Sequence, residues 1–322
     1  MTEKENALRM ILKTGDPEWV PCSHRCFSRL IPTEVIRERP PKREGSGYDW
    51  FGCYWFFDEE TNGFFQDLSE PVVPDIRKWR DYVRFPDLDA IEWEKSVPPT
   101  TAGIDRENKL LQFSWESGPF ERLHSLVGFE QALMSIYTEQ EAFKEMLEAI
   151  TDFRCAAVER VAEYYKPDII INMDDLGAQK APLMSGETFR RFLKPCEKRI
   201  GDAIKRRGII YQHHSCGSMD VFAGDLIDCG AAMIHGLLAP YNDLASVQRS
   251  FSGKVTVEGG VNRQLIDGAE TTEEELREEV RRCISAYGPY KNYVYLSNSM
   301  FPERIAIMVD EAVEFGGRFY SR

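Results

Sequence analysis

Three observations predict an α/β fold, specifically a (β/α)8 barrel that carries an irregular N-terminal insertion. The chain has 322 residues, which suits one barrel of roughly 250 residues plus insertions. From about residue 109 onward, short apolar runs alternate with longer helical patterns, as in repeated strand–helix units. Polar residues directly follow several of these runs, and a barrel carries its chemistry where its strands end. An open, doubly wound sheet is the alternative, but no GxGxxG motif follows any apolar run.

Seven short apolar segments are typical of strands. The run at 168–173 contains Ile169, Ile170 and Ile171 in succession, as in a strand covered on both faces. A complete barrel needs an eighth strand, for which the irregular region has room. The predicted strands are 19–22, 110–115, 168–173, 208–211, 232–234, 255–257 and 293–296.

Helical patterns separate these segments. The first has apolar residues at positions 7, 8, 11 and 12 and closes at Gly15. Pro195 interrupts the pattern at 187–207 and should kink that helix or end it early. Thr272 and Glu275 form a capping-box pattern at the start of another helix. The remaining helical patterns lie at about 143–161, 218–228 and 302–317.

Residues 40–104 are the least regular part of the chain. They are rich in Pro, Gly and aromatic residues, including Trp50, Phe51 and Trp55. A flexible linker would lack the aromatic side chains, so the composition favours a folded insertion of loops and short strands at the barrel mouth. We therefore expect a single domain over residues 1–322, with 40–104 as an insertion within it.

The composition excludes several classes of protein. Lys and Arg number 40 against 53 Asp and Glu, so the formal net charge of −13 gives no field that attracts nucleic acid. No apolar run approaches the roughly 18 residues of a membrane-spanning helix. The opening MTEKENALRM lacks the apolar stretch of a secretion signal, and the eight cysteines are scattered through a large chain. We expect a cytoplasmic globular enzyme.

Polar side chains follow the predicted strands at their carboxyl ends. His214 and Cys216 are two residues apart, and imidazole and thiolate are ligands that zinc favours. A buried cysteine beside a hydrogen-bonded histidine is the alternative, and His213 should point away from the same centre if the backbone is extended. Asp174 and Asp175 suit acid–base chemistry, metal binding or contact with a substrate hydroxyl, or else a helix cap or an ion pair. The candidates are Asp174, Asp175, Gln179, His214, Cys216, His235 and Glu258.

Several motifs taken together resemble the uroporphyrinogen decarboxylase-like superfamily. Its corrinoid-dependent methyltransferase branch, which includes O-demethylases and methylcobalamin methyltransferases, is the most similar part. The resemblance implies a (β/α)8 barrel with a deep active-site cleft at the carboxyl face. The motifs are Thr14-Gly15-Asp16 through Val20-Pro21, Asp49-x-Phe51-Gly52-x-x-Trp55, Phe85-Pro86-Asp87-Leu88-Asp89, Asp174-Asp175-Leu176-Gly177-x-Gln179, Ser185-x-Glu187-x-Phe189, Lys194-Pro195 and His214-x-Cys216-Gly217.

The chain departs from this superfamily at two places. The decarboxylase itself has an Arg-Gln-Ala-Gly-Arg stretch that grips substrate carboxylates, and here only Arg25 and Arg29 remain of it. In the coenzyme M methyltransferases a second cysteine near the last strand completes the His-x-Cys zinc site, and here 296–300 reads LSNSM. Glu258 is our preferred third ligand because carboxylates join nitrogen and sulfur ligands in open zinc sites, and His235 is the alternative.

The leading hypothesis is a zinc-dependent methyltransferase that moves a methyl group between a small methylated substrate and a corrinoid (cobalamin) on a partner protein. The expected zinc ligands are His214, Cys216 and Glu258, with Asp175 and Gln179 as catalytic groups. Arg25, Arg29, Trp55 and Asp174 would bind substrate, the arginines through a carboxylate and Trp55 as part of an aromatic lid with Trp50 and Phe51. The alternative roles are surface ion pairs for the two arginines and packing in the core of the insertion for the aromatic side chains.

Two other functions stay open at this point. One is a metal-free decarboxylase of a polycarboxylate, in which Asp175 stabilises a protonated pyrrole intermediate. The other is a non-enzymatic corrinoid- or tetrapyrrole-binding protein. The sequence names neither the methyl donor nor the acceptor, it leaves the direction of transfer open, and it is compatible with a homodimer.

Overall fold

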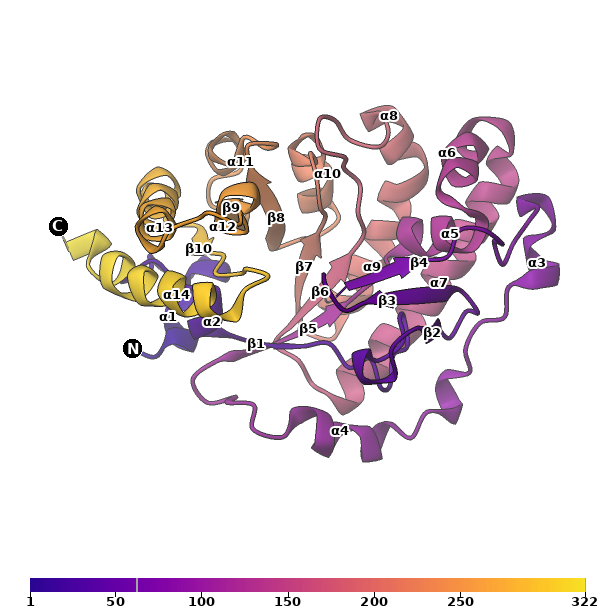
Figure 1. Ribbon diagram of the computed structural model, residues 1–322, viewed down its shortest axis with the longest axis horizontal. Helices are drawn as coiled ribbons and strands as arrows, with labels where there is room; N and C mark the ends of the chain where they lie inside the picture. Colours follow the sequence, from indigo (N-terminus) through magenta and orange to yellow (C-terminus); the bar gives the residue numbers. More distant parts are fainter. Residues whose placement is uncertain (62, 322) are drawn as a thin grey trace.

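The computed structural model describes residues 1–61 and 63–321 and has an α/β barrel architecture, as predicted (Figure 1). Seven parallel strands lie in the order β1-β5-β6-β7-β8-β9-β10 and curl around a common interior. The segment that precedes β1 meets β10 at the other end of this order through a bridge between Cys22 and Tyr295, where the Tyr295 N–H donates to the Pro21 carbonyl at 2.8 Å. The strands are β1 (Phe27–Leu30), β5 (Leu110–Trp115), β6 (Ile169–Met173), β7 (Ile210–His214), β8 (Met233–Ala239), β9 (Thr256–Asn262) and β10 (Tyr293–Tyr295).

The first predicted strand is placed differently. Residues 19–22 contribute only the bridge at Cys22, and the regular strand β1 begins five residues later, after the one-turn helix α2 (Ser23–Cys26). Pro21 has no N–H to donate to a strand ladder, which limits pairing at this point. The consequence is that Arg25 and Arg29, four residues apart, lie on a helical turn and on a strand respectively.

Helices follow the strands and surround the sheet (Figure 1). No helix in the described part of the chain is long and apolar enough to cross a membrane. The helices outside the insertion are α1 (Glu3–Ile11), α5 (Pro119–Val127), α6 (Phe129–Thr138), α7 (Gln140–Tyr164), α8 (Gly186–Thr188), α9 (Lys194–Arg206), α10 (Ala223–Asp228), α11 (Leu244–Ser250), α12 (Arg263–Ile266), α13 (Glu273–Tyr287) and α14 (Pro302–Gly317). Short helical turns span Asp220–Phe222, Gly288–Tyr290 and Phe319–Ser321.

Two predicted helix features are confirmed. A π-helical turn at Phe189–Leu193 precedes α9, so Pro195 lies in the first turn of a new helix, where its missing N–H costs nothing. Thr272 and Glu275 form a complete capping box at the start of α13.

The barrel interior is closed at its amino end. Ala7, Met10 and Ile11 of α1 pack against an apolar layer contributed by the strands. The strand residues of this layer are Phe27, Leu110, Ile169, Ile171, Met233 and Val294. Because the amino end is filled by apolar side chains, only the carboxyl end of the barrel is available for a polar site.

The insertion contains a three-stranded antiparallel sheet and several short helices. Trp50 and Phe51 pack edge-on against Phe153 of α7, with Phe51 buried in the core and Trp50 partly buried against it. The buried side chains of the insertion join those of the barrel helices in one hydrophobic core. Its elements are β2 (Gly47–Tyr48), β3 (Tyr54–Asp58), β4 (Gly63–Gln66), α3 (Trp79–Tyr82) and α4 (Trp93–Thr101), with helical turns at Lys42–Glu44, Ile76–Lys78 and Leu88–Ala90.

A buried ion-pair network attaches the insertion to the barrel. The Arg122 guanidinium, on α5, binds the Asp49 carboxylate at 2.7 Å and also pairs with Glu38. Asp49 in turn accepts hydrogen bonds from the backbone N–H groups of Phe51 and Cys53. All three charged side chains are at most 6 % exposed, so each charge depends on its partners.

Trp55, which the sequence analysis expects to contact substrate, belongs to the same network. Its Nε1–H donates to Asp49 at 3.0 Å, and the guanidinium of Arg39 lies over its ring at 5.0 Å. The side chain is buried, since Asp49 and Arg39 occupy its polar edge and its face.

Replacing Arg122 by Met should destabilise the protein by about 3 to 5 kcal/mol. The change leaves the carboxylates of Glu38 and Asp49 buried without their main cation, which is the costly way to break a buried ion pair. Urea unfolding followed by tryptophan fluorescence measures the difference.

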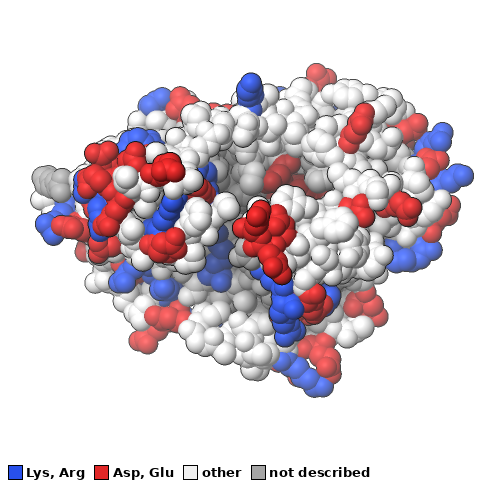
Figure 2. Space-filling view, in the orientation of Figure 1, with Lys and Arg blue, Asp and Glu red and all other residues white. Residues whose placement is uncertain are grey.

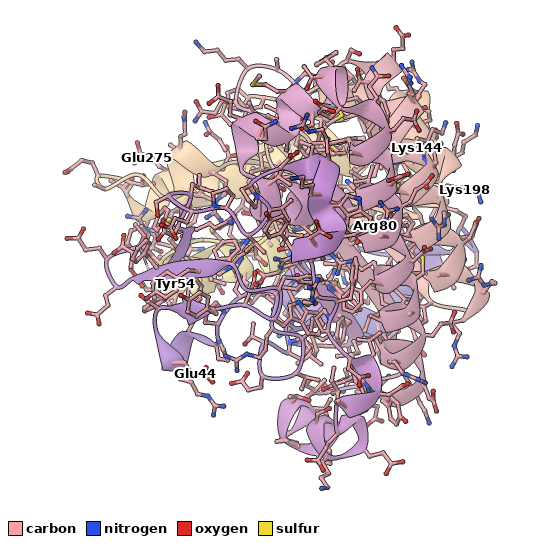
Figure 3. All side chains as sticks on the ribbon, turned by 90° about the vertical axis from the view of Figure 1, so that its right-hand side faces the viewer. Glu44, Tyr54, Arg80, Lys144, Lys198 and Glu275 are labelled. Atoms are coloured by element: carbon pink, nitrogen blue, oxygen red, sulfur yellow. The ribbon has the colours of Figure 1, made fainter. Side chains whose placement is uncertain are left out.

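Arg80→Met is the matched control. Arg80 pairs with Glu145 on α7 but is 62 % exposed, and it lies on α3 beside α7, on the side of the molecule away from Tyr54 in Figure 3. Its loss should change stability by less than about 0.5 kcal/mol. Equal effects of the two substitutions would show that the buried network does not anchor the insertion.

Candidate functional site

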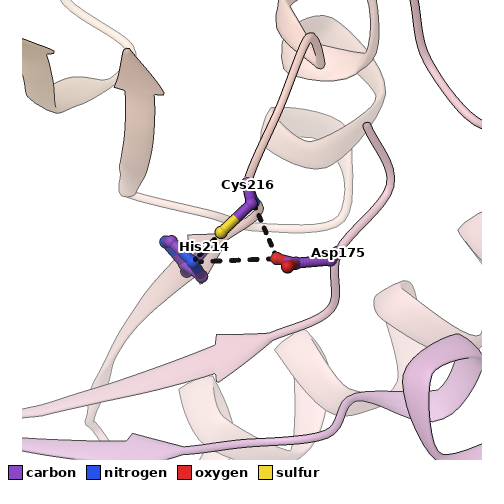
Figure 4. A group of neighbouring side chains, drawn as sticks. All are labelled: Asp175, His214 and Cys216. Atoms are coloured by element: carbon purple, nitrogen blue, oxygen red, sulfur yellow. Dashed lines mark hydrogen bonds and ion pairs between the residues drawn. The ribbon is translucent and has the colours of Figure 1, made fainter. Parts of the chain in front are cut away.

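Three side chains from two neighbouring strand ends converge at the carboxyl end of the barrel (Figure 4). The ligand atoms of Asp175, His214 and Cys216 all lie within 4.8 Å of one another. His214 Nε2 is 3.5 Å from Cys216 Sγ and 3.7 Å from Asp175 Oδ1. A carboxylate, an imidazole and a thiol thus face a common point, the donor set of an open zinc site.

Close packing of two loops sets this geometry. A Cβ on Gly177, in the loop after β6, would lie 2.5 Å from the Ser218 carbonyl oxygen in the loop after β7. Gly217 adopts φ +72°, and a Cβ there would meet the Gly177 backbone at 2.3 Å. The Cys216 N–H then donates to Asp175 Oδ1 at 2.7 Å. The two glycines let the loops touch, and this contact places Asp175 beside Cys216.

The protein environment keeps His214 and Cys216 in their neutral forms. Burial lowers the pKa of His214 to about 4, although the Asp175 carboxylate opposes this shift. Cys216 can be reached from solvent, yet the protein atoms around it remove enough water to raise its pKa well above the usual value, and Asp175 raises it further. Without a bound cation the thiol is therefore protonated at neutral pH.

His235 and Glu258 lie behind His214 and take no part in the group of three. His235 Nδ1 is 2.5 Å from His214 Nδ1, and His235 Nε2 is 3.8 Å from Glu258 Oε1. Glu258 has no exposed surface and faces the Arg29 guanidinium at 3.5 Å. The carboxylate beside the Cys216 thiol is that of Asp175, while Glu258 and His235, the third ligands expected from the sequence, lie on the Nδ1 side of the His214 ring.

Arg29 is part of a closed ring of polar side chains inside the barrel. Its Nε–H donates to Gln112 at 2.9 Å, Gln112 donates to Gln212 at 2.6 Å, and Gln212 donates to Glu258 at 2.8 Å. Arg29 and Gln112 also line a cavity of about 340 Å³ beside β1 and the loop after β10, together with His24. Arg29 is thus placed where a ligand can reach it.

Arg25 and Gln179 lie outside the group of three. Arg25 is 52 % exposed and pairs with Glu3 at 3.6 Å, next to Trp19 and Cys22 near the amino ends of the strands. Its contact with a substrate carboxylate stays a prediction. Gln179 is exposed in the loop after β6, between the bridged residues Gly177 and Pro182, and makes no hydrogen bond to the three converging side chains in the described structure.

The paired motifs Asp174-Asp175 and His213-His214 each divide into a structural and a site residue. Asp174 is fully buried and accepts hydrogen bonds from the N–H groups of Phe120 and Glu121, so it caps α5 and has no free oxygen for substrate. His213 points away from the site, as expected, and lies 3.2 Å from Glu197. Neighbouring residues on an extended backbone point in opposite directions, which explains the division.

The sequence analysis missed three charged or titratable residues around Asp175 and Cys216. Burial raises the pKa of Glu121 to about 8, and the nearby Asp175 charge adds to this shift. Burial lowers the pKa of His124 to about 4. The Arg263 guanidinium lies close enough to Cys216 to favour its thiolate. Glu121 lies in the first turn of the helix that follows β5, a position after a strand end that could have signalled it.

The site opens to solvent. Figure 2 shows a hollow near the centre of the molecule's face, with acidic side-chain atoms on its wall. Cys216 is exposed, the Asp175 side chain is 35 % exposed and the His214 side chain 15 %, so the thiol and the carboxylate lie nearer to the opening than the imidazole.

Comparison with known proteins supports the architecture. A solved structure described as a methyltransferase from Methanosarcina mazei matches with a TM-score of 0.74 and 14 % sequence identity, over 98 % of this chain and 99 % of that chain. A Xaa-Pro dipeptidase with bound methionine gives a TM-score of 0.30 at 12 % identity over 50 % and 43 % of the chains, which is too low to indicate a shared fold. No match to a curated protein was found. The model of the family described as uroporphyrinogen decarboxylase (URO-D) matches residues 65–312. The chain therefore belongs to the uroporphyrinogen decarboxylase family.

Proposed function

We propose that this protein is a zinc-dependent methyltransferase that moves a methyl group between a small methylated substrate and a corrinoid cofactor carried by a partner protein. The observation that carries the proposal is the convergence of Asp175, His214 and Cys216 at the open end of the barrel. The fold shared with a Methanosarcina methyltransferase is compatible with this activity.

The three side chains fit zinc in type and number. Zinc takes thiolate, imidazole and carboxylate ligands, and catalytic sites use three protein ligands and leave a fourth position for substrate. His214 is neutral at physiological pH, as a ligand must be, and Arg263 lies near the sulfur and favours the thiolate. In this proposal Asp175 occupies the role that a second cysteine has in the coenzyme M methyltransferases.

When bound, the zinc would supply Lewis acidity toward the heteroatom that carries the methyl group. The chain's own residues would orient the substrate and manage its proton. Glu121 is half-buried beside Asp175, and its pKa of about 8 keeps a proton on its carboxyl group at neutral pH. It is therefore suited to donate a proton to the heteroatom that departs from the methyl group.

The charges around Asp175 argue against a polycarboxylate substrate. Its carboxylate neighbour is Glu121, and Glu116 lies close to Glu121. The Arg29 side chain, which could hold a substrate carboxylate, is already paired with the buried Glu258. A metal-free decarboxylase would need several uncommitted cations here, so we favour the methyltransferase.

Zinc analysis tests the metal. The wild-type protein should bind about one zinc ion per chain, and Cys216→Ser and Asp175→Asn should each bind at least about 100-fold more weakly, because losing a ligand costs more than the 10- to 100-fold typical of outer-shell changes. Competition with a chromophoric chelator measures the affinities. Cys155→Ser removes a half-buried thiol on α7 and is the matched control, with unchanged affinity. If the wild-type protein binds zinc no more tightly than Cys216→Ser, a metal-free decarboxylase becomes the better-supported function.

Zinc affinity should increase about tenfold per pH unit between pH 6 and 8. Cys216 has a raised pKa and must lose its proton to bind the metal, so one proton is released per zinc ion over this whole range. His214, with a pKa of about 4, is already neutral and adds no slope. Chelator competition at several pH values gives the slope, which Cys216→Ser should lack. A flat wild-type profile would contradict thiolate ligation.

Methyl transfer itself can be followed with free cobalamin. Zinc-loaded protein and cob(I)alamin are incubated with a panel of methyl ethers, methyl thioethers and methylamines, and methylcobalamin formation is read from the absorption spectrum. At least one class should be demethylated by wild type and not by Cys216→Ser. If the protein binds zinc but transfers a methyl group from none of these compound classes, it is a metalloprotein with another activity.

A further inference from the structure

One face of the three-stranded sheet in the insertion carries aromatic side chains that face solvent. Tyr48 lies opposite Tyr54 in the β2–β3 pairing, and Phe56 lies opposite Phe65 in the β3–β4 pairing. Tyr54 and Phe56 are two residues apart on β3, so their side chains point to the same side of the sheet. The ring centres lie 5.0 Å apart in the Tyr48–Tyr54 pair and 5.2 Å apart in the Tyr54–Phe56 pair. We refer to these four side chains as the outer aromatic face.

The insertion does not need the outer aromatic face for its own packing. Alternate residues of β3 and β4 point to the opposite side of the sheet, where Trp55 is buried and the Phe57 and Phe64 ring centres lie 5.1 Å apart. Exposed apolar patches on a soluble protein often mark interaction sites, since their burial in an interface releases the water around them. The exposed fractions on the outer aromatic face are 63 % for Tyr48, 50 % for Phe56 and 55 % for Phe65.

The outer aromatic face lies on the same side of the molecule as the opening of the barrel. Beneath the sheet, the Arg39 guanidinium lies over the Trp55 ring at 5.0 Å and is 3.9 Å from Glu116, the residue that follows β5. The sheet therefore lies over the carboxyl end of β5. Figure 3 places Tyr54 at the left-hand side of the molecule, which is the side that faces the viewer in Figure 2, where the hollow lies.

The insertion holds this face in a fixed orientation. The Trp55 Nε1–H donates to Asp49 at 3.0 Å, and Asp49 binds Arg122 of α5 at 2.7 Å. The sheet is thus attached to a barrel helix through buried polar contacts. A surface that is already ordered loses little conformational entropy when a partner binds.

We infer that the outer aromatic face is the docking surface for the partner protein that carries the corrinoid. The inference rests on the proposed function, which requires such a partner. The cobalt of the corrinoid must come within bonding distance of the methyl group, so the carrier protein must cover the opening of the barrel during transfer. A protein that covers the opening also meets the surface beside it.

The size of the face favours a transient partner over a second copy of this chain. An aromatic side chain has roughly 150 to 250 Å² to bury, so the three that are at least half exposed offer roughly 300 Å² together. Two copies packed face to face would therefore bury roughly 600 Å², whereas stable complexes bury about 1,200 to 2,000 Å². A carrier that arrives with one form of the corrinoid and leaves with another must dissociate in every cycle, which a small apolar face permits.

The acidic turn between β3 and β4 indicates the charge that the partner should carry. Asp58 is fixed in this turn, because it accepts hydrogen bonds from the Glu60 N–H at 2.9 Å and from the Thr61 hydroxyl at 3.0 Å. Glu59 and Glu60 are exposed, and neither forms an ion pair within the described part of the chain. Opposite charges at the rim of an interface accelerate association. We therefore expect a partner whose apolar docking surface is bordered by Lys or Arg side chains.

The test uses the corrinoid-carrying protein of the cells that make this chain, purified by following its corrinoid absorption. Sedimentation velocity at a visible wavelength follows only that protein, because amino acids and zinc do not absorb visible light. The double variant Phe56→Thr/Phe65→Thr should weaken the complex at least about tenfold, since aromatic anchors contribute much of the binding energy of an interface. Threonine suits a strand, and two threonines form a favourable cross-strand pair, so the sheet is retained.

Leu12→Thr is the matched control, because Leu12 is a 54 % exposed apolar side chain at the closed amino end of the barrel. It should leave the complex unchanged. Tyr48→Thr, on the neighbouring strand, should also weaken the complex and takes the place of the double variant if that variant does not fold, which circular dichroism checks. Glu59→Gln/Glu60→Gln should slow association and reduce its dependence on salt.

The outcomes separate the docking surface from the proposed function. The double variant should bind zinc and methylate free cob(I)alamin as the wild-type protein does, because Phe56 and Phe65 lie outside the zinc site. A wild-type protein that binds no zinc overturns the proposed function. A wild-type protein that methylates free cob(I)alamin, but forms no complex with the corrinoid protein or forms one that the folded double variant matches in affinity, overturns the docking surface alone. A wild-type dimer that the double variant dissociates also overturns it, because a second copy then covers the face.

Discussion

The Glu258 carboxylate lies in the middle of the barrel without any exposed surface, and the arrangement of the interior depends on how its charge is balanced. A buried carboxylate is tolerated only when it is paired and hydrogen-bonded. Arg29 supplies the opposite charge, while Gln112 and Gln212 connect the two through hydrogen bonds from neighbouring strands. This polar ring separates the apolar layer closed by α1 from the open end, where His235 and His214 rest against it.

The insertion and the site are linked through one helix. Arg122 on α5 is held by Glu38 and Asp49 of the insertion region, and the first turn of the same helix is capped by Asp174. The next residue, Asp175, points to Cys216. The position of Asp175 is therefore fixed from both sides, by the cap on α5 and by the close contact between Gly177 and the loop after β7.

The candidate site was predictable to the extent that it depends on strand ends. His214, Cys216 and Asp175 follow apolar runs that do form β7 and β6, and parallel strand ends meet at one face. Glu258 also lies on a barrel strand, but the sequence did not indicate its depth. Strand β9 continues to Asn262, so Glu258 lies inside the strand and joins the polar ring, whereas His214 is the last residue of β7. The sequence likewise did not indicate that Arg25 lies on the helical turn α2, where it pairs with Glu3, while Arg29 lies on β1.

The sequence by itself determined the alternation of strands and helices, the capping box of α13, the break before Pro195 and the opposite directions of His213 and His214. These features depend on local periodicity, on backbone geometry and on the missing N–H of proline, all of which act within a few residues. Only the tertiary structure decided that Asp174 caps a helix, that Trp55 is buried beside Asp49, and that His235 and Glu258 lie behind His214. Those outcomes depend on contacts between residues tens of positions apart, and such contacts are fixed by packing and strand register.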